Sequence, residues 1–281
     1  MSETSSITPP SSEYLVLRLP LLERGAYYGR VLRVLSVSDF KLKYAGSILG
    51  YVWSLMKPLA YFGVLWVVFG GLFKSNIPKF TLYLLIGVVM WTFVADAVTT
   101  TLPSIVARGA ILRRIAFPPI VIPLASTITA LMTFSLNLVI IVAFIAGYRV
   151  VPSIRWLLLV PLLLELYLFV LGLSLLFATL NVRFRDIAQI WEVGSQLLFF
   201  TAPVMYPASI LPVWARHIVV FNPFVQILMD TRRVILGGDS QAIQLVGLHG
   251  NHIIPLAVIA CIVFLSWFTY RRQSHRFAEV A

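Results

Sequence analysis

Residues 183–207 read RFRDIAQIWEVGSQLLFFTAPVMYP, and they decide how the rest of the chain is divided. The segment begins with three charged residues, carries Glu192 and Gln196 into an apolar run, and ends at Pro203 and Pro207. A simple membrane anchor needs neither the charges nor the early stop. Polar side chains within a lipid-embedded helix usually face protein or water. The segment is therefore predicted to be a weak membrane span with one wet face.

The composition indicates that lipid is part of the solvent of this chain. Of its 281 residues only 12% are charged, whereas a soluble domain averages about 25%. The mean hydropathy is +0.91. The excess of 22 Lys and Arg over 11 Asp and Glu fits bases that flank membrane spans better than a nucleic-acid-binding surface. A single cysteine, Cys261, excludes an internal disulfide and a multi-thiolate metal site.

Five apolar runs approach the roughly 20 residues that a membrane-spanning helix needs, and the opening segment supplies a weaker sixth. The predicted spans are residues 52–73, 81–106, 119–147, 156–180, 187–206 and 253–270. The predicted fold class is therefore all-α: a polytopic membrane protein with six transmembrane helices, formed as one domain over residues 21–281. Residues 1–20 are polar and rich in Pro and Ser, and they are predicted to be a disordered tail.

The basic residues set the expected orientation. With the N-terminus in the cytoplasm, fifteen Lys and Arg fall on the cytoplasmic side and seven on the outer side. The positive-inside rule therefore predicts that both termini are cytoplasmic. In this scheme Arg232 and Arg233 are counted among the outer bases.

Two segments outside the spans have patterns of their own. Residues 21–45 mix Leu, Val and Tyr with spaced bases, which predicts an amphipathic helix along the cytoplasmic face, although an ordinary juxtamembrane anchor fits as well. Residues 207–236 contain short apolar pieces separated by prolines. Irregular backbone at membrane depth must be covered by protein or water. This region is therefore predicted to form short re-entrant helices on the outer side.

Sequence motifs for enzyme chemistry are missing. The chain has no G-x-x-x-x-G-K-[ST] P-loop and no H-E-x-x-H, and His249 and His252 fit a solvated loop better than a metal site. Asp96 and Glu165 fall inside predicted spans, where a carboxylate is costly. They are interpreted as buried groups, with a proton relay as the alternative. We therefore expect a protein that is not an enzyme.

Three stretches carry more specific patterns than a generic membrane protein. They are DFKLKYAGSILGYVWSLMKPL at 39–59, RGAILRRIAFPPIVIPL at 108–124, and the opening segment followed by FNPFVQILMDTRRVILGG at 221–238. In this order and spacing they resemble the permease subunit of ABC-2-type exporters of polysaccharides. That group includes exporters of O-antigens, teichoic acids and cell-wall galactans. The resemblance covers about residues 30–275.

The resemblance implies a transport subunit that works with separate ATPases. The expected function is ATP-driven export of a lipid-linked cell-envelope polysaccharide, an O-antigen-like glycan or a galactan, across a bacterial inner (plasma) membrane. The expected partners are two copies of an ABC ATPase, a second copy of this chain, the lipid-linked glycan and membrane lipid, with no nucleic acid. No cofactor is expected on this chain, and ATP and Mg²⁺ would bind to the ATPase. An ABC-2 exporter of a small lipid or drug, or a proton-coupled secondary transporter, remains the alternative.

The resemblance also implies roles for individual residues, and no catalytic or metal-binding residue is among them. Loop 104–117 would be the coupling helix that docks into the ATPase, through Arg108, Ile111, Leu112, Arg113, Arg114 and Phe117. The channel would be lined by Tyr61, Phe62, Trp66, Phe69, Trp91, Phe93, Glu192, Gln196, Phe199, Phe200 and Tyr206. Its cytoplasmic entrance would be formed by Arg183, Arg185 and Asp186. A structural or gating role inside the membrane is expected for Asp96 and Glu165. For the aromatic residues, an interfacial belt or contact with lipid is the alternative.

Overall fold

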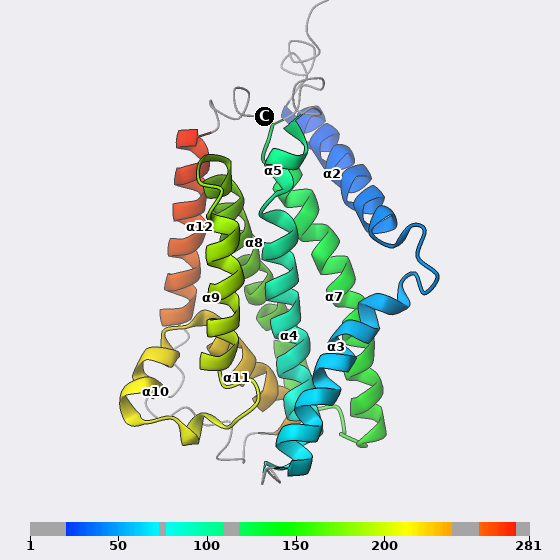
Figure 1. The fold of residues 1–281 in the computed structure, drawn as a ribbon, viewed down its shortest axis with the longest axis vertical. Helices are drawn as coiled ribbons and strands as arrows, with labels where there is room; N and C mark the ends of the chain where they lie inside the picture. The colour runs from blue at the N-terminus through cyan, green and yellow to red at the C-terminus, as the bar shows by residue number, and fades with distance from the viewer. Residues whose placement is uncertain (1–20, 73–76, 110–117, 238–252, 274–281) are drawn as a thin grey trace, which may run out of the picture.

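The computed structural model describes residues 21–72, 77–109, 118–237 and 253–273. Within these ranges every regular element is a helix, and the long helices stand side by side in one bundle (Figure 1). The all-α, polytopic membrane fold that the sequence predicts is therefore confirmed.

Among the described residues, five helical segments are long and apolar enough to cross a membrane. They are α3 with its π-helical continuation (Val52–Leu72), α4 (Phe80–Thr101), α7 (Val121–Gly147), a 3-10 turn with α8 (Ile154–Arg183), and α12 (Ile253–Gln273). They coincide with five of the six predicted spans to within a few residues. The prediction for the second span was too long, because the α-helix ends at Thr101 and a separate short helix, α5 (Ser104–Ala107), follows Pro103.

Helix α4 is the centre of the bundle. In its most apolar window 78% of the residues are buried, and it contacts α3, α7, α8, α9 and α11. A helix that is apolar on all sides is stable only where protein or lipid surrounds it completely. Helix α3 is its opposite, with 11% of the corresponding window buried. The fold therefore has a covered core helix and a peripheral helix that leaves most of its surface open.

Helix α2 (Leu21–Tyr44) covers the segment for which an amphipathic helix was predicted. It packs along α7, with Val31, Leu32 and Leu35 against Val121 and Ile122. The bases of the same helix lie on its exposed side, as at Arg30 and Arg33. Helix α2 begins and α12 ends at the same end of the bundle (Figure 1).

The opening segment of the sequence analysis forms α9 (Ile187–Thr201), which has only 15 residues. The prediction that this span continues to residue 206 was wrong. Ala202 is extended at φ −76°, ψ 138°, as expected for a residue that precedes proline. The chain then continues without regular structure to the short helices of the next region.

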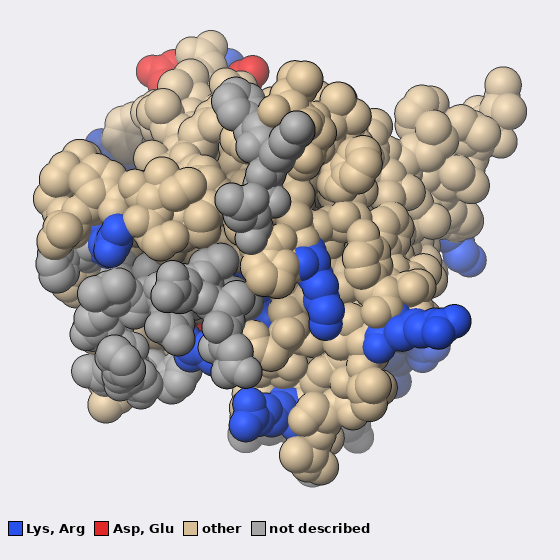
Figure 2. All heavy atoms as spheres, turned by 90° about the horizontal axis from the view of Figure 1, so that it is seen from below, with Lys and Arg blue, Asp and Glu red and all other residues tan. Residues whose placement is uncertain are grey.

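Residues 207–236 form three short helices. They are the 3-10 turn Ala208–Ile210, α10 (Val213–Val220) and α11 (Pro223–Leu236). Helix α11 starts sharply because the side chain of Asn222 accepts a hydrogen bond from the Phe224 N–H, and Pro223 occupies the first turn. It packs against α4, α8 and α12. Figure 2 shows this end of the molecule, where Lys and Arg are scattered over a mostly uncharged surface.

Candidate functional site

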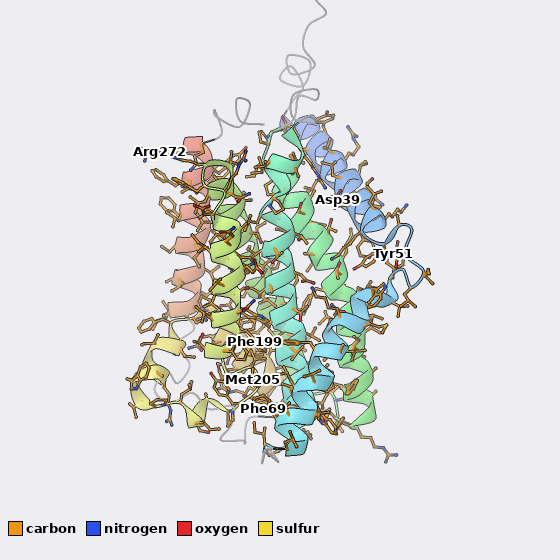
Figure 3. All side chains as sticks on the ribbon, viewed as in Figure 1. Asp39, Tyr51, Phe69, Phe199, Met205 and Arg272 are labelled. Atoms are coloured by element: carbon orange, nitrogen blue, oxygen red, sulfur yellow. The ribbon has the colours of Figure 1, made fainter. Side chains whose placement is uncertain are left out.

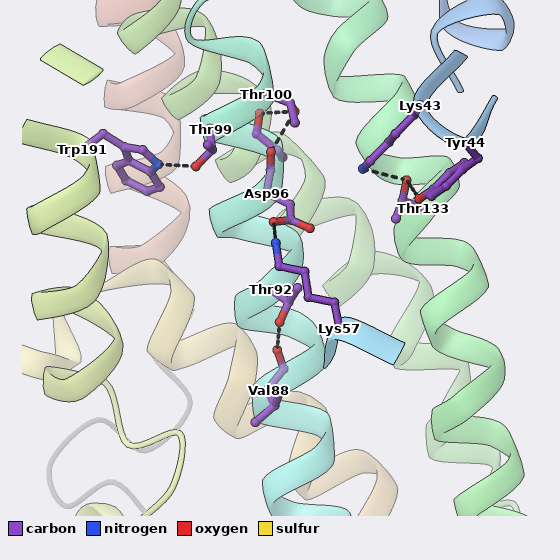
Figure 4. A network of polar contacts seen from close by, with 11 residues as sticks. Lys43, Tyr44, Lys57, Val88, Thr92, Asp96, Thr99, Thr100, Thr133 and Trp191 are labelled. Carbon is purple, nitrogen blue, oxygen red and sulfur yellow. Dashed lines mark hydrogen bonds and ion pairs between the residues drawn. The ribbon is translucent and has the colours of Figure 1, made fainter. Parts of the chain in front are cut away.

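Two cavities meet at an ion pair between α3 and α4. The Lys57 Nζ lies 2.8 Å from the Asp96 Oδ1, and these two residues line both cavities (Figure 4). The smaller cavity has a volume of about 250 Å³ and lies between α3, α4 and α9. The larger has a volume of about 700 Å³ and lies between the end of α2, the start of α3, α4 and α7. The pair thus separates two compartments along one side of α4.

Asp96 belongs to a polar stripe on an otherwise apolar helix. Thr92, Asp96, Thr99 and Thr100 follow one another at spacings of four, three and one, which places them on one face of α4. The Thr99 Oγ1 accepts a hydrogen bond of 3.0 Å from Nε1 of Trp191, which joins α9 to the stripe. An exposed ion pair contributes little to stability, so the position of this stripe between cavities is more informative than its energy.

Five of the predicted channel-lining residues line the smaller cavity. They are Tyr61, Trp91, Gln196, Phe199 and Phe200. The ring of Phe199 is the centre of this group, with centroids 5.3 Å from Tyr61 and 5.9 Å from Trp91, and it lies between α9 and α4 (Figure 3). Residues from three helices that are far apart in sequence therefore form one aromatic wall.

The other aromatic candidates on α3 and α4 lie elsewhere. Phe62 and Phe93 are buried against α7, where they contact Phe144 and Phe134 at centroid distances of 5.8 Å and 4.4 Å. These contacts give Phe62 and Phe93 a packing role within this chain, so they are not part of the aromatic wall. Trp66 donates a hydrogen bond of 3.0 Å to Thr81 Oγ1. Phe69 is partly buried against the main core.

The candidates near the ends of α9 are mostly polar or exposed. Glu192 is exposed one turn before Gln196, on the same helix face. The Tyr206 hydroxyl donates to the carbonyl oxygens of Phe200 and Thr201, at 2.9 Å and 3.0 Å, and so caps the last turn of α9. The proposed entrance residues Arg183, Arg185 and Asp186 are exposed at the turn between α8 and α9, and Glu165 is half-buried in α8.

The coupling loop is described only in part. Arg108 forms an ion pair with Asp39 of α2, at 2.6 Å between Nη2 and Oδ1. The remaining coupling candidates, Ile111, Leu112, Arg113, Arg114 and Phe117, lie outside the described residues. Arg108 is thus committed to a partner within this chain, which the sequence did not predict.

Arg232 is the important residue that sequence reasoning misplaced. It was counted as an outer base, but it is fully buried in α11. Its guanidinium donates to the carbonyl oxygens of Tyr83, Pro203 and Val204, at 2.7–3.0 Å, and lies 3.4 Å from the centre of the Tyr83 ring. The sequence does contain a signal that Arg232 is buried. It lies in the apolar stripe of α11, four residues after Leu228 and three before Ile235.

Comparison with known proteins shows which proteins this chain is similar to over most of its length. A family model described as ABC-2 type transporter matches residues 30–232. The O-antigen export system permease protein RfbA of Klebsiella pneumoniae is 29% identical over 257 residues, which cover 90% of this chain and 96% of that protein. A protein of the same description from Myxococcus xanthus is 30% identical over 76% of this chain and 83% of its own length. The polysialic acid transport protein KpsM of Escherichia coli is 19% identical over 85% of this chain and 93% of its own.

Proposed function

The chain belongs to the ABC-2 type transporter family, and on that premise we propose that it is the permease subunit of an ATP-driven exporter of a cell-envelope polysaccharide. The names of its relatives refer to O-antigen export and polysialic acid transport, and both cargoes are polysaccharides. This common cargo class favours a glycan over a small drug. The match extends over nearly the full length of the Klebsiella relative, which supports a shared role for the entire permease.

The observation that carries the proposal is the aromatic and polar wall of the smaller cavity. Tyr61, Phe199 and Phe200 lie there beside Lys57 and Gln196. Charged and amide groups at membrane depth face water or protein rather than lipid. Sugar C–H groups pack on aromatic faces while sugar hydroxyls hydrogen-bond to polar side chains. A wall of this kind offers many weak contacts to a sliding glycan chain.

A second copy of the chain completes the passage in this proposal. Only 11% of the residues in the apolar window of α3 are buried, and α9 exposes Glu192, Gln196 and Phe200 on one side. Lipid suits the apolar part of this surface but not Glu192. A two-fold dimer would bring both copies of the wall to one interface. The channel would then lie between α3 and α9 of the two copies.

The energy is supplied by a separate ATPase in this scheme, since the sequence contains no P-loop. Loop 104–117 is the proposed docking element. Its described part begins with α5 and Arg108, and the ion pair with Asp39 ties that part to α2. A movement of the loop would therefore be transmitted to α2 and, through it, to the start of α3. The membrane would be the bacterial inner membrane, with both termini in the cytoplasm.

Co-expression with a candidate ABC ATPase from the same organism tests the proposal directly. We expect a tagged permease to retain the ATPase through purification, and the complex to hydrolyse ATP. Depletion of the permease in cells should cause the lipid-linked glycan to accumulate in the cytoplasm. If no complex formed and the permease alone transported its cargo under a proton gradient, ATP-driven export would be contradicted in favour of secondary transport.

Charge reversal in the coupling loop separates docking from folding. The double variant Arg113→Glu/Arg114→Glu is expected to reduce the amount of co-purified ATPase about tenfold or more. The two reversed charges would repel the ATPase surface that the arginines are proposed to attract. The matched control is Arg149→Glu/Arg155→Glu, which reverses two exposed bases at the opposite end of the bundle. The control should co-purify normally. Equal recovery of the ATPase with both variants would contradict the docking role.

A further inference from the structure

The larger cavity contains a feature that the aromatic wall does not explain: two lysines from different helices. Lys43 stands at the end of α2 and Lys57 in α3, and both line this space of about 700 Å³ (Figure 4). The opposite side is formed by α4 and α7, through residues such as Asp96 and Thr133. The cavity therefore lies where the peripheral helices α2 and α3 meet the core.

The charges of this cavity do not balance. Lys57 is paired with Asp96, but Lys43 forms no ion pair with any residue that the structure describes. Its Nζ donates instead to the hydroxyl of Thr133, at 3.5 Å. Two ammonium groups thus face one carboxylate. An excess of positive charge in this open cavity, where both lysines are exposed, favours an anion.

The hydrogen-bonding groups of the cavity favour an anion with several oxygens. An ammonium group has three N–H donors and no acceptor, and Lys43 uses one of these donors for Thr133. Residues with hydroxyl groups from the loop, from α3 and from α4 line the same cavity. They are Ser47, Ser54, Thr99 and Thr100. A phosphate group accepts from both lysines more readily than a neutral sugar, because charge-assisted hydrogen bonds are about twice as strong as neutral ones.

The edge of the cavity is apolar. Trp53 and Met56 line it and are about half exposed, and the neighbouring loop exposes Ile48 and Leu49. Exposed apolar side chains beside a cationic cavity suit an amphiphile with an anionic head and a hydrocarbon tail. Neither a soluble anion nor a neutral glycan would use both parts of this surface.

We propose that this cavity binds the phosphate or diphosphate group of the lipid to which the exported glycan is attached. Lys43 and Lys57 make the two cationic contacts, and the tail lies against Trp53 and Met56. This assignment rests on the proposed export function for the identity of the cargo. Asp96 acts as the counter-ion that holds Lys57 in the empty site and is displaced when the phosphate enters.

Binding is tested with the full-length chain in phosphatidylcholine nanodiscs, with farnesyl diphosphate as the probe and tryptophan fluorescence as the signal. The double variant Lys43→Gln/Lys57→Gln is expected to weaken binding by about tenfold or more, since each lysine makes a charge-assisted hydrogen bond. Lys41→Gln is the matched control, because Lys41 is an exposed base two residues from Lys43 that does not line the cavity. It should bind as the wild type does.

The sign of the effect at Asp96 separates a binding site from a structural ion pair. Asp96→Asn removes the carboxylate that competes for Lys57, so it should tighten binding of farnesyl diphosphate about threefold or more. If the pair were only structural, Asp96→Asn would leave the affinity unchanged or lower it. Lys57→Arg keeps the charge and should retain most of the affinity. Thermal unfolding of each variant shows that a lost signal is not a lost fold.

Three further ligands identify the chemistry. Farnesol lacks the charge and inorganic diphosphate lacks the tail, so both should bind at least about tenfold more weakly than farnesyl diphosphate. Nanodiscs that contain phosphatidylglycerol should not abolish binding. Competition by that lipid would overturn the proposal in favour of a general phospholipid site, and equal binding by the double variant would overturn it outright. Because the assay needs no ATPase, its result is independent of whether the ATPase complex forms.

Discussion

Replacement of Arg232 by methionine is expected to lower the free energy of unfolding by at least about 3 kcal/mol. The guanidinium donates to three carbonyl oxygens, and Val204 and Pro203 lie in a segment without helical hydrogen bonds. Methionine fills similar space but donates nothing. Each buried carbonyl that loses its donor costs about 1–3 kcal/mol. The carbonyl groups cannot be removed by mutation, so the variant keeps most of their desolvation cost, although the Pro203 oxygen retains the Tyr83 hydroxyl as a donor at 3.4 Å.

Arg233→Met is the matched control for this prediction. Arg233 is the next residue of the same helix, but its side chain is 45% exposed and pairs with Asp230 across one turn. Its loss should change stability by no more than about 0.5 kcal/mol. Arg232→Lys should fall between the two, because an ammonium keeps the charge but cannot reproduce the planar fork that reaches three carbonyls.

The measurement is the midpoint of thermal unfolding of the detergent-solubilised protein, followed by tryptophan fluorescence. A loss of 3 kcal/mol corresponds to a midpoint lower by roughly 5–10 °C in a chain of this size. If the Arg232→Met and Arg233→Met variants had the same midpoint of thermal unfolding, the buried guanidinium would not be needed to hold α11 in place.

Gly87→Ala is expected to produce the second large loss, of about 1–3 kcal/mol. A Cβ at position 87 would overlap the Arg232 Nη2, and it would lie 3.0 Å from Cγ1 and 3.2 Å from the carbonyl oxygen of Val204. Because Gly87 has no side chain, it leaves the space through which the Arg232 guanidinium reaches the backbone of α4. Gly29→Ala in α2 is the control, because nothing lies within 4 Å of its Cβ position. There alanine should stabilise the helix by up to about 1 kcal/mol.

The two sites should also be coupled. The double variant Gly87→Ala/Arg232→Met lacks the guanidinium with which the new methyl group would clash. The combined loss of stability should therefore be smaller than the sum of the two single losses. The double-mutant cycle is measured with the same unfolding assay. Strict additivity would show that Gly87 and Arg232 act independently, against the contact described here.

This buried arginine matters for the region of short helices because it joins three parts of the end of the bundle at which α11 lies. It lies in α11, binds the segment after α9 through Pro203 and Val204, and reaches the backbone of α4 at Tyr83. The Tyr83 hydroxyl donates in turn to the carbonyl oxygen of Tyr206, at 3.0 Å. The short helices of residues 207–236 are thus fixed to the core helix rather than to one another alone.

Much of the fold was predictable because the signals are local. The apolar runs of α4 and α7 are long enough to require a membrane, and the prolines after α9 predicted that its span stops early. The end of α9 was still placed five residues too late. Residues 202–206 are apolar enough for a span, and only their backbone of turns and bends separates them from the helix. Hydropathy does not distinguish buried irregular chain from a buried helix.

The candidate site was predictable as a collection of residue types but not as an arrangement. Trp91 and Phe93 are two residues apart in one apolar helix, yet Trp91 lines the smaller cavity and Phe93 stacks on Phe134. The polar stripe of α4 begins at Thr92, between the two rings, so it does not tell which ring faces a cavity and which packs in the core. The partners of α4 decide which aromatic residue faces which neighbour.

The sequence by itself determined that this chain is a bundle of membrane helices without a nucleotide-binding motif, since length, hydropathy and motif are properties of contiguous residues. Only the tertiary structure decided the partners of its few charged groups. Lys57 meets Asp96 across 39 positions, and Arg232 meets Tyr83 across 149. A charge inside a membrane protein must find a partner, but the packing of helices fixes which one. The same packing placed Lys43 in a cavity where no described residue serves as its counter-ion, and the proposed cargo would supply one.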